Sequence, residues 1–329
     1  RVRHALALAP VLATGLAASP LRRAASPAAR AVTARPQAAS REAARAHLLG
    51  FPPDAVPAQR AREARLLELP APDEARRHLR RLTEEPHVAG TPEDRAVVEY
   101  LRATLEGYGI PAEIAEYHVY LPYPREIRVT LLAPDSQPLA VRERGLPVDK
   151  DSYSPRIHPG WNAYSANGTV EGEVVYVNYG LPSDYAALER LGVDVRGKIV
   201  LARYGRSFRA VKPILAQERG AAGVLLYSDP ADDGYARGDP YPEGPWRPPS
   251  AIQRGTVKFG SLYTGDPLTP GWAATAKARR LSPAEAASLP KIPVAPLGYG
   301  EARKILRALA GPNVPEQNWQ GALPFPYHV

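Results

Sequence analysis

The sequence predicts an α/β fold in which an N-terminal helical region precedes a strand-rich region. Two observations lead to this prediction. Helical patterns dominate from about residue 60 to residue 108, and from about residue 174 short apolar runs suited to buried strands alternate with helical segments. The 37 prolines predict many loops and irregular edges. At 329 residues, the chain has room for two domains.

The helical region divides into three elements. Residues 57–69 and 72–83 have the pattern of two short amphipathic helices. The third helix has a clear start, because Thr91 suits the N-cap, Pro92 the first helical position and Asp94 the capping-box position. Its apolar face consists of Val97, Val98, Leu101 and Leu105. We expect it to end near residues 107–109, where two glycines occur.

The strand-rich region begins with expected strands at 114–121, 127–133 and 139–142. Buried strands are expected at 174–177, 199–202 and 224–227, with another at 292–295. Intervening helices are expected from Ser183, as N-cap, to residue 191, then at about 209–219 and 298–310. Strands that alternate with helices in this way indicate βαβ units.

Composition excludes several function classes. The formal net charge is +8, but the excess arginines are scattered and form no aromatic-interleaved basic stripe, so a nucleic-acid partner is not expected. The absence of cysteine excludes disulfides, thiolate zinc sites and cysteine nucleophiles. No apolar run is long enough for a transmembrane segment.

The first 40 residues read as a signal-like and low-complexity segment. A basic start, a short apolar run over 5–18 and small residues near 17–19 resemble a secretory signal, which predicts a secreted or periplasmic protein. The alternative is alanine-rich low-complexity sequence from a biased genome. Residues 20–46, rich in Ala, Arg and Pro, are expected to form a disordered linker.

The sequence contains none of the common catalytic motifs. None of the seven histidines lies in His-Glu-x-x-His, and there is no Gly-x-Ser-x-Gly, Walker loop or Gly-x-Gly-x-x-Gly. His87 could be a metal ligand, but packing at a helix entry is favoured. Asp229, Asp232 and Asp233 are an acidic cluster for which a solvated loop is favoured over a catalytic pair.

Two loops carry the strongest functional signal. An apolar run at 223–227 breaks into a loop of some forty residues, and loops of that length are usually functional or disordered. Upstream, Arg209 follows a strand and a glycine turn and is expected at a helix start, where a guanidinium and free backbone N–H groups suit a carboxylate ligand. The alternative is a surface arginine paired with a neighbouring acid, which spacing alone favours.

Six motifs carry a resemblance to a known family: residues 86–91, 204–209, 223–232, 253–255, 265–271 and 292–294. Together they resemble the glutamate carboxypeptidase II (prostate-specific membrane antigen)-like family of zinc peptidases, in the same order and with gaps, from about residue 84 to 329. The resemblance implies that 41–118 is the N-terminal part of a peptidase domain and that 119–329 is an inserted, β-rich α/β protease-associated (apical) domain.

The resemblance also implies what this chain lacks. In the family, the ligands of two zinc ions, the catalytic glutamate and the dimerisation helices lie in a part that would follow residue 329. The chain alone would then be an inactive fragment with no catalytic residue, and the full-length protein a homodimeric metallocarboxypeptidase acting on peptides with a free C-terminal carboxylate. An exposed apolar face on helix 92–108 would be the consequence of truncation.

Five positions match functional positions of the family. Arg209 matches the arginine that grips the substrate's α-carboxylate, and Phe208 lines the same pocket. Thr256 replaces an asparagine that contacts a glutamate side chain, so a strict preference for C-terminal glutamate is not expected. Thr269 and Trp272 match two ligands of a structural calcium, with Trp272 in place of a tyrosine.

Two other readings keep the architecture but change the function. A transferrin-receptor-like protein would share the fold without peptidase ligands, but such a receptor has no need of a carboxylate grip. A stand-alone protease-associated binding module would not need the N-terminal helical piece. The sequence therefore favours the substrate-recognition portion of a peptidase.

Overall fold

The structure is a computed structural model that describes residues 47–329. The chain divides into two compact units, Arg1–Arg81 and Leu82–Val329, which are considered separately. The expected secretory signal and the linker at 20–46 lie outside the described residues. None of the described helices is both long and apolar enough to span a membrane.

The first unit contains α2 (Val56–Glu68) and most of α3 (Pro72–Leu82), which confirms the two predicted helices. Acidic residues occupy the first turn of α3, and Arg80 and Arg81 occupy its last turn. This distribution complements the helix dipole. No residue of α3 is buried.

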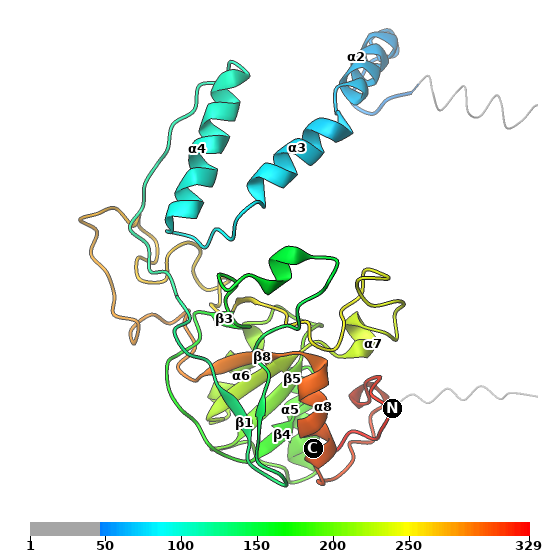
Figure 1. Cartoon of the computed structure of the whole chain (residues 1–329), viewed down its shortest axis with the longest axis vertical. Helices are drawn as coiled ribbons and strands as arrows, with labels where there is room; N and C mark the ends of the chain where they lie inside the picture. The colour runs from blue at the N-terminus through cyan, green and yellow to red at the C-terminus, as the bar shows by residue number, and fades with distance from the viewer. Residues whose placement is uncertain (1–46) are drawn as a thin grey trace, which may run out of the picture. The chain divides into compact units, whose positions relative to one another are not determined.

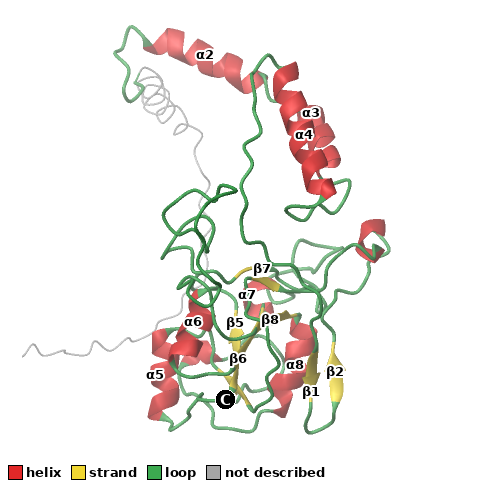
Figure 2. Ribbon diagram, turned by 90° about the vertical axis from the view of Figure 1, so that its left-hand side faces the viewer, coloured by secondary structure: helices red, strands yellow, loops and turns green. Residues whose placement is uncertain are grey.

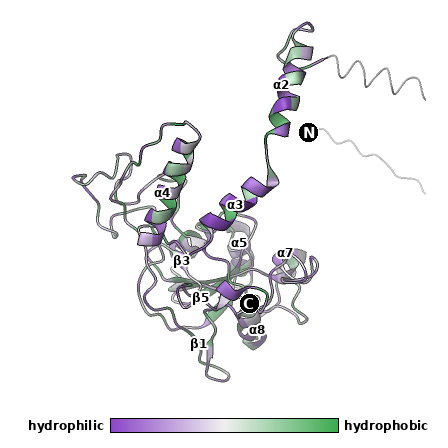
Figure 3. Ribbon diagram, turned by 45° about the horizontal axis from the view of Figure 1, so that its top comes forward, coloured by the Kyte–Doolittle hydropathy of each residue, from purple (hydrophilic) through white to green (hydrophobic). Residues whose placement is uncertain are grey.

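Helix α4 (Pro92–Gly107) begins as the sequence predicts. The Thr91 hydroxyl accepts a hydrogen bond from the Asp94 backbone N–H at 3.3 Å. The Asp94 carboxylate accepts from the Gly90 N–H, because the Thr91 N–H is already donated to the Val88 carbonyl. No residue of α4 is buried, and hydrophobic residues lie along one side of it (Figure 3). Of the apolar face expected on this helix, Leu101 and Leu105 are exposed, whereas Val97 and Val98 are partly buried.

The next segment departs from the prediction. Residues 114–121 form no strand, because their backbone groups bond to a distant loop instead of to a ladder. The His118 N–H donates to the Ala274 carbonyl, and the Tyr120 N–H donates to the Asp266 carboxylate. An antiparallel pair follows, β1 (Val129–Leu131) with β2 (Gln137–Leu139), and a short 3-10 helix η1 (Lys150–Tyr153).

A four-stranded parallel sheet forms the core of the second unit. Its order is β4 (Val174–Tyr176), β5 (Ile199–Arg203), β6 (Gly223–Tyr227) and β8 (Val294–Leu297). Helices α5 (Pro182–Arg190) and α6 (Val211–Glu218) lie on one side of the sheet and α8 (Tyr299–Ala308) on the other (Figure 2). Because helices cover both faces, β6 is buried throughout, as its unbroken apolar sequence predicts.

Two predicted helix starts are wrong. Helix α5 begins at Pro182 with Leu181, and not Ser183, as N-cap, and the Asp184 carboxylate accepts a hydrogen bond from the Leu181 N–H at 2.9 Å. Helix α6 begins at Val211, so Arg209 lies just before the helix. The Val211 and Lys212 N–H groups already donate to the carbonyls of residues 208 and 209. Two of the free N–H groups expected at this helix start are therefore occupied.

Small elements at the carboxyl end of the sheet complete the fold (Figure 1). Strands β3 (Asn162–Ala163) and β7 (Gly255–Thr256) form a two-stranded parallel pair, in which Asn162 lies opposite Gly255. Short helices α7 (Pro230–Asp233) and η2 (Gln317–Trp319) follow β6 and α8. The pairing of β3 with β7 brings residues some ninety positions apart beside the loop that follows β5.

Candidate functional site

The loop that carries Arg209 is held in a tight backbone conformation. Gly205 (φ 104°) and Arg206 (φ 61°) both lie in the left-handed region, which is uncommon for a side chain as large as arginine. The buried Lys212 ammonium secures this turn, because it donates to the carbonyl of Tyr179 at 2.6 Å and to that of Gly205 at 3.0 Å. The turn places Phe208 and Arg209 beyond the end of β5.

The Arg209 guanidinium lies near two aromatic rings and against the backbone of a glycine. Its central carbon is 5.9 Å from the Tyr204 ring centroid and 5.8 Å from that of Phe208. It also lies against Gly255, where a Cβ atom would come within 2.0 Å of a terminal guanidinium nitrogen. Tyr204 is buried, while Phe208 is 45% exposed, so one ring supports the arginine from inside and the other borders solvent.

Arg209 has no acidic partner among residues 47–329. Its Nε atom is buried without a hydrogen-bond acceptor, and none of the ion pairs in the described region includes it. The alternative interpretation, in which Arg209 pairs with a neighbouring acid, is therefore wrong for this part of the chain. A half-buried guanidinium with unused donors is suited to bind a carboxylate or another planar anion.

A buried network lies beneath the arginine. The Asn162 side-chain amide donates to the Tyr204 hydroxyl at 3.0 Å and to the Gly255 carbonyl at 3.3 Å. The Tyr204 hydroxyl in turn donates to the Gln253 carbonyl at 2.8 Å. Burial raises the pKa of Tyr204 to about 12, opposed in part by Asn162 and by the charge of Arg209. Sequence analysis did not identify Asn162, and no local motif distinguishes it.

Thr256 lies next to Gly255 on β7 and is partly buried. Its hydroxyl oxygen accepts from the Lys258 backbone N–H at 3.1 Å, and its hydroxyl hydrogen has no acceptor among the described residues. The structure therefore brings the loop that carries Phe208 and Arg209 beside strand β7, which carries Thr256. Their assignment to a substrate pocket stays a prediction.

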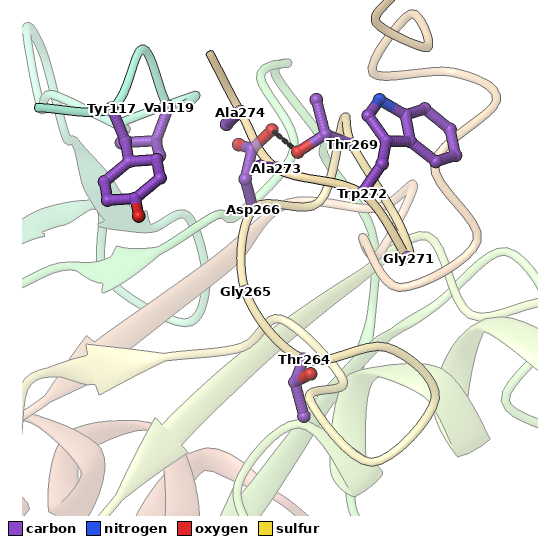
Figure 4. A pocket seen from close by; sticks show the side chains of 10 residues that line it. All are labelled: Tyr117, Val119, Thr264, Gly265, Asp266, Thr269, Gly271, Trp272, Ala273 and Ala274. Atoms are coloured by element: carbon purple, nitrogen blue, oxygen red, sulfur yellow. Dashed lines mark hydrogen bonds between the residues drawn. The ribbon is translucent and has the colours of Figure 1, made fainter. Parts of the chain in front are cut away.

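The two predicted calcium residues lie at a separate, open pocket of about 520 Å³ (Figure 4). The buried Thr269 donates its hydroxyl to Asp266 at 2.9 Å and accepts the Trp272 N–H on its carbonyl. The other Asp266 oxygen accepts from Tyr120. Calcium takes six to eight oxygen ligands, and these few oxygens, already hydrogen-bonded to one another, are too small a set. Calcium binding stays a prediction that needs further ligands.

One residue of the acidic cluster after β6, Asp229, stabilises the fold through buried hydrogen bonds. Asp229 is fully buried and accepts from the hydroxyls of Tyr227 and Tyr327 and from two backbone N–H groups. The prediction of a solvated loop is therefore wrong for Asp229. Asp232 accepts from the Tyr179 hydroxyl and Asp233 from Arg247, so the three carboxylates have separate partners.

The other metal candidate, His87, is exposed. Its Nδ1 atom lies 3.0 Å from the carbonyl oxygen of Glu85. Within residues 47–329, no group of three or more His, Cys, Asp or Glu side chains is arranged to hold a metal ion. The described residues therefore offer no zinc site.

Part of the second unit matches a known domain family. Residues 170–258 match the PA domain family model. This range covers β4, β5, β6 and β7, including the loop of Arg209 and the strand of Thr256. It lies inside the region 119–329 that the sequence assigns to a protease-associated domain, so the presence of such a domain is confirmed.

Relatives extend beyond this domain. The chain is 41% identical over 190 residues to a probable glutamate carboxypeptidase of Arthroderma benhamiae, covering 56% of this chain and 26% of that protein. It is 37% identical over 248 residues to probable glutamate carboxypeptidase VP8 of Zea mays, covering 74% and 31%. To aminopeptidase NAALADL1 of Mus musculus it is 36% identical over 270 residues, covering 77% and 35%.

The chain is a member of the glutamate carboxypeptidase II-like family that carries a PA domain. It spans about a third of the length of the curated relatives it matches. Among solved structures, it is similar to an aminopeptidase from Aneurinibacillus sp. strain AM-1, with a TM-score of 0.31 and 23% identity over 55% of this chain and 33% of that one.

Proposed function

We propose that this chain is the substrate-recognition portion of a zinc metallocarboxypeptidase that removes C-terminal residues from peptides. The observation that carries the proposal is the Arg209 guanidinium, which is positioned by its surroundings but has no acidic partner among the described residues. A half-buried guanidinium with unused donors can form charge-assisted hydrogen bonds to an anion. A free C-terminal carboxylate is the anion that every peptide substrate of a carboxypeptidase offers.

The names of the relatives support a peptidase, but they include both carboxypeptidases and aminopeptidases. Several are named glutamate carboxypeptidases, while the mouse and rat relatives are named aminopeptidases. These activities differ in which end of the peptide must be free. The unpaired guanidinium favours recognition of a carboxylate and therefore the C-terminal end.

In this proposal the residues of the chain bind and orient the substrate. Arg209 holds the terminal carboxylate, Phe208 covers it from the solvent side, and Thr256 offers one hydroxyl to the adjoining side chain. The zinc ions, which would supply the hydrolytic chemistry, need ligands from outside residues 47–329. No step of bond cleavage is assigned to the described residues.

The test uses the full-length protein and three forms of one peptide: free at both ends, amidated at the C-terminus and acetylated at the N-terminus. We expect amidation to abolish cleavage and acetylation to leave it intact. The reverse pattern would establish an aminopeptidase and refute the proposal. We also expect Arg209→Ala to raise KM about tenfold or more for the free peptide, because a charge-assisted contact of roughly 1.5–3 kcal/mol is lost. An unchanged KM would refute the role of Arg209.

A further inference from the structure

Arg209 lies on a surface that only glycine permits. The ideal Cβ position at Gly255 lies 2.0 Å from one terminal guanidinium nitrogen of Arg209, 2.3 Å from the central carbon and 2.9 Å from Nε. These distances are far below van der Waals contact, so the planar group rests directly on the Gly255 backbone. Gly255 also has φ 149°, in the region that favours glycine. Any side chain here would displace the guanidinium.

Gly255 is itself held by a hydrogen bond from a buried side chain. Asn162 is 1% exposed, and its amide nitrogen donates both to the Gly255 carbonyl and to the Tyr204 hydroxyl. Tyr204 carries one of the two rings beside Arg209 and is tied to the carbonyl of Gln253. Asn162 therefore links both surfaces on which the guanidinium rests. Its own Oδ1 atom is buried without a donor among the described residues.

These contacts restrict Arg209 without neutralising it. The rings of Tyr204 and Phe208 and the backbone of Gly255 limit where the guanidinium can lie, while its Nε remains without an acceptor. A flexible arginine loses side-chain entropy when it binds a ligand, and a guanidinium restrained beforehand loses less. The arrangement thus favours binding of a planar anion at one position.

We infer that Gly255 and Asn162 are positioning residues that fix the Arg209 guanidinium for a carboxylate, with Tyr204 as the link between them. The identity of the ligand rests on the proposed function, whereas the positioning of Arg209 by Gly255 and Asn162 does not. The positioning and the ligand can therefore be tested separately.

The geometry is tested in this chain by NMR of the arginine Nε–H groups. The Arg209 signal is assigned by its loss in Arg209→Lys. We expect slow solvent exchange in the wild type and at least about tenfold faster exchange in Gly255→Ala, because the added methyl group displaces the guanidinium from its buried position. Gly260→Ala is the matched control, since a Cβ there meets nothing within 4 Å. Equal exchange in Gly255→Ala and the wild type would overturn the inference.

Tyr204→Phe keeps the inference testable if Gly255→Ala does not fold. It removes one hydroxyl and so cuts the links of the ring to Asn162 and Gln253 while the ring itself remains. We expect intermediate exchange at the Arg209 Nε–H and a similar effect in Asn162→Ala. Wild-type exchange in both variants would contradict a positioning role for Asn162.

The ligand is tested by kinetics in the full-length protein. We expect Gly255→Ala to raise KM about tenfold for a peptide with a free C-terminal carboxylate while kcat changes less than twofold, and Gly260→Ala to change neither. A merely structural role for Gly255 would instead lower the amount of active enzyme and leave KM unchanged. If exchange increases but KM does not, Gly255 positions Arg209 and the proposed function of Arg209 fails.

Discussion

Two arginines six positions apart, Arg203 and Arg209, mark two different regions of the domain. Arg203 ends β5 and is 2% exposed. Its guanidinium donates to the Asn178 side-chain oxygen and to the Asn318 carbonyl, lies 3.8 Å from Asp232, and stacks on Tyr179 at 4.1 Å. Arg209 is more accessible and has no such partner among the described residues.

The difference separates structural from ligand-binding charge. A buried guanidinium that donates to other parts of the chain joins segments of the fold, as Arg203 joins the ends of β4 and β5 to η2. A restrained guanidinium whose donors are unused can bind something further. Burial alone would indicate Arg203 as the arginine of a binding site. The lack of hydrogen-bond partners indicates Arg209 instead.

The largest effect should come from Arg203→Met. The substitution leaves the buried Asn178 side-chain oxygen without its donor and also removes a hydrogen bond to the carbonyl of the exposed Asn318. We expect the free energy of unfolding to fall by about 3 kcal/mol, because unsatisfied buried polar groups each cost roughly 1–3 kcal/mol. Urea unfolding followed by circular dichroism measures this change. A loss below about 1 kcal/mol would remove the structural assignment of Arg203.

An intermediate effect concerns pH. Burial lowers the pKa of Lys212 to about 8, opposed by Asp184 and reinforced by Arg203. Because the folded state binds this proton less tightly than the unfolded state, with its ordinary pKa of 10.5, stability should rise as pH increases from 8 toward 10. The Lys212 contribution is about 2 kcal/mol over that interval, given about 1.4 kcal/mol per pKa unit.

The measurement compares urea unfolding of wild type and Lys212→Met at pH 8, 9 and 10. The difference between the two isolates Lys212 from the buried tyrosines, such as Tyr176 and Tyr327, whose pKa values are raised by burial. Those tyrosines act in the opposite direction, and their contribution is lost as the unfolded chain ionises near pH 10. Parallel curves for the two proteins would show that the Lys212 ammonium is not destabilised by burial.

The smallest effect on stability should come from Arg209→Ala. The side chain has no hydrogen-bond or ionic partner to lose among the described residues, so we expect the free energy of unfolding to change by less than about 0.5 kcal/mol. The same urea titration measures it beside Arg203→Met. A loss comparable with that of Arg203→Met would place both arginines in the structural class.

Local patterns predicted much of the fold because the relevant interactions are local. The Thr91 cap bonds within three residues, and the apolar runs of β4, β5 and β6 are continuous because helices cover both faces of a parallel sheet. The segment 114–121 was predicted as a strand and is not one. Its alternating pattern suits a strand, but the partners of its backbone lie about 150 residues away in the 266–274 loop.

The candidate site divides in the same way. The motif at 204–209 and its family resemblance identified Arg209, Phe208 and Thr256 from the sequence. Only the tertiary structure revealed that Arg209 lacks an acid among residues 47–329, that it rests on Gly255, and that Asn162 holds this glycine. Those facts depend on the pairing of β3 with β7, and strand pairing over some ninety residues has no local signal in the sequence. The sequence by itself thus determined which charged group is available, and the tertiary structure decided that it is restrained and unpaired.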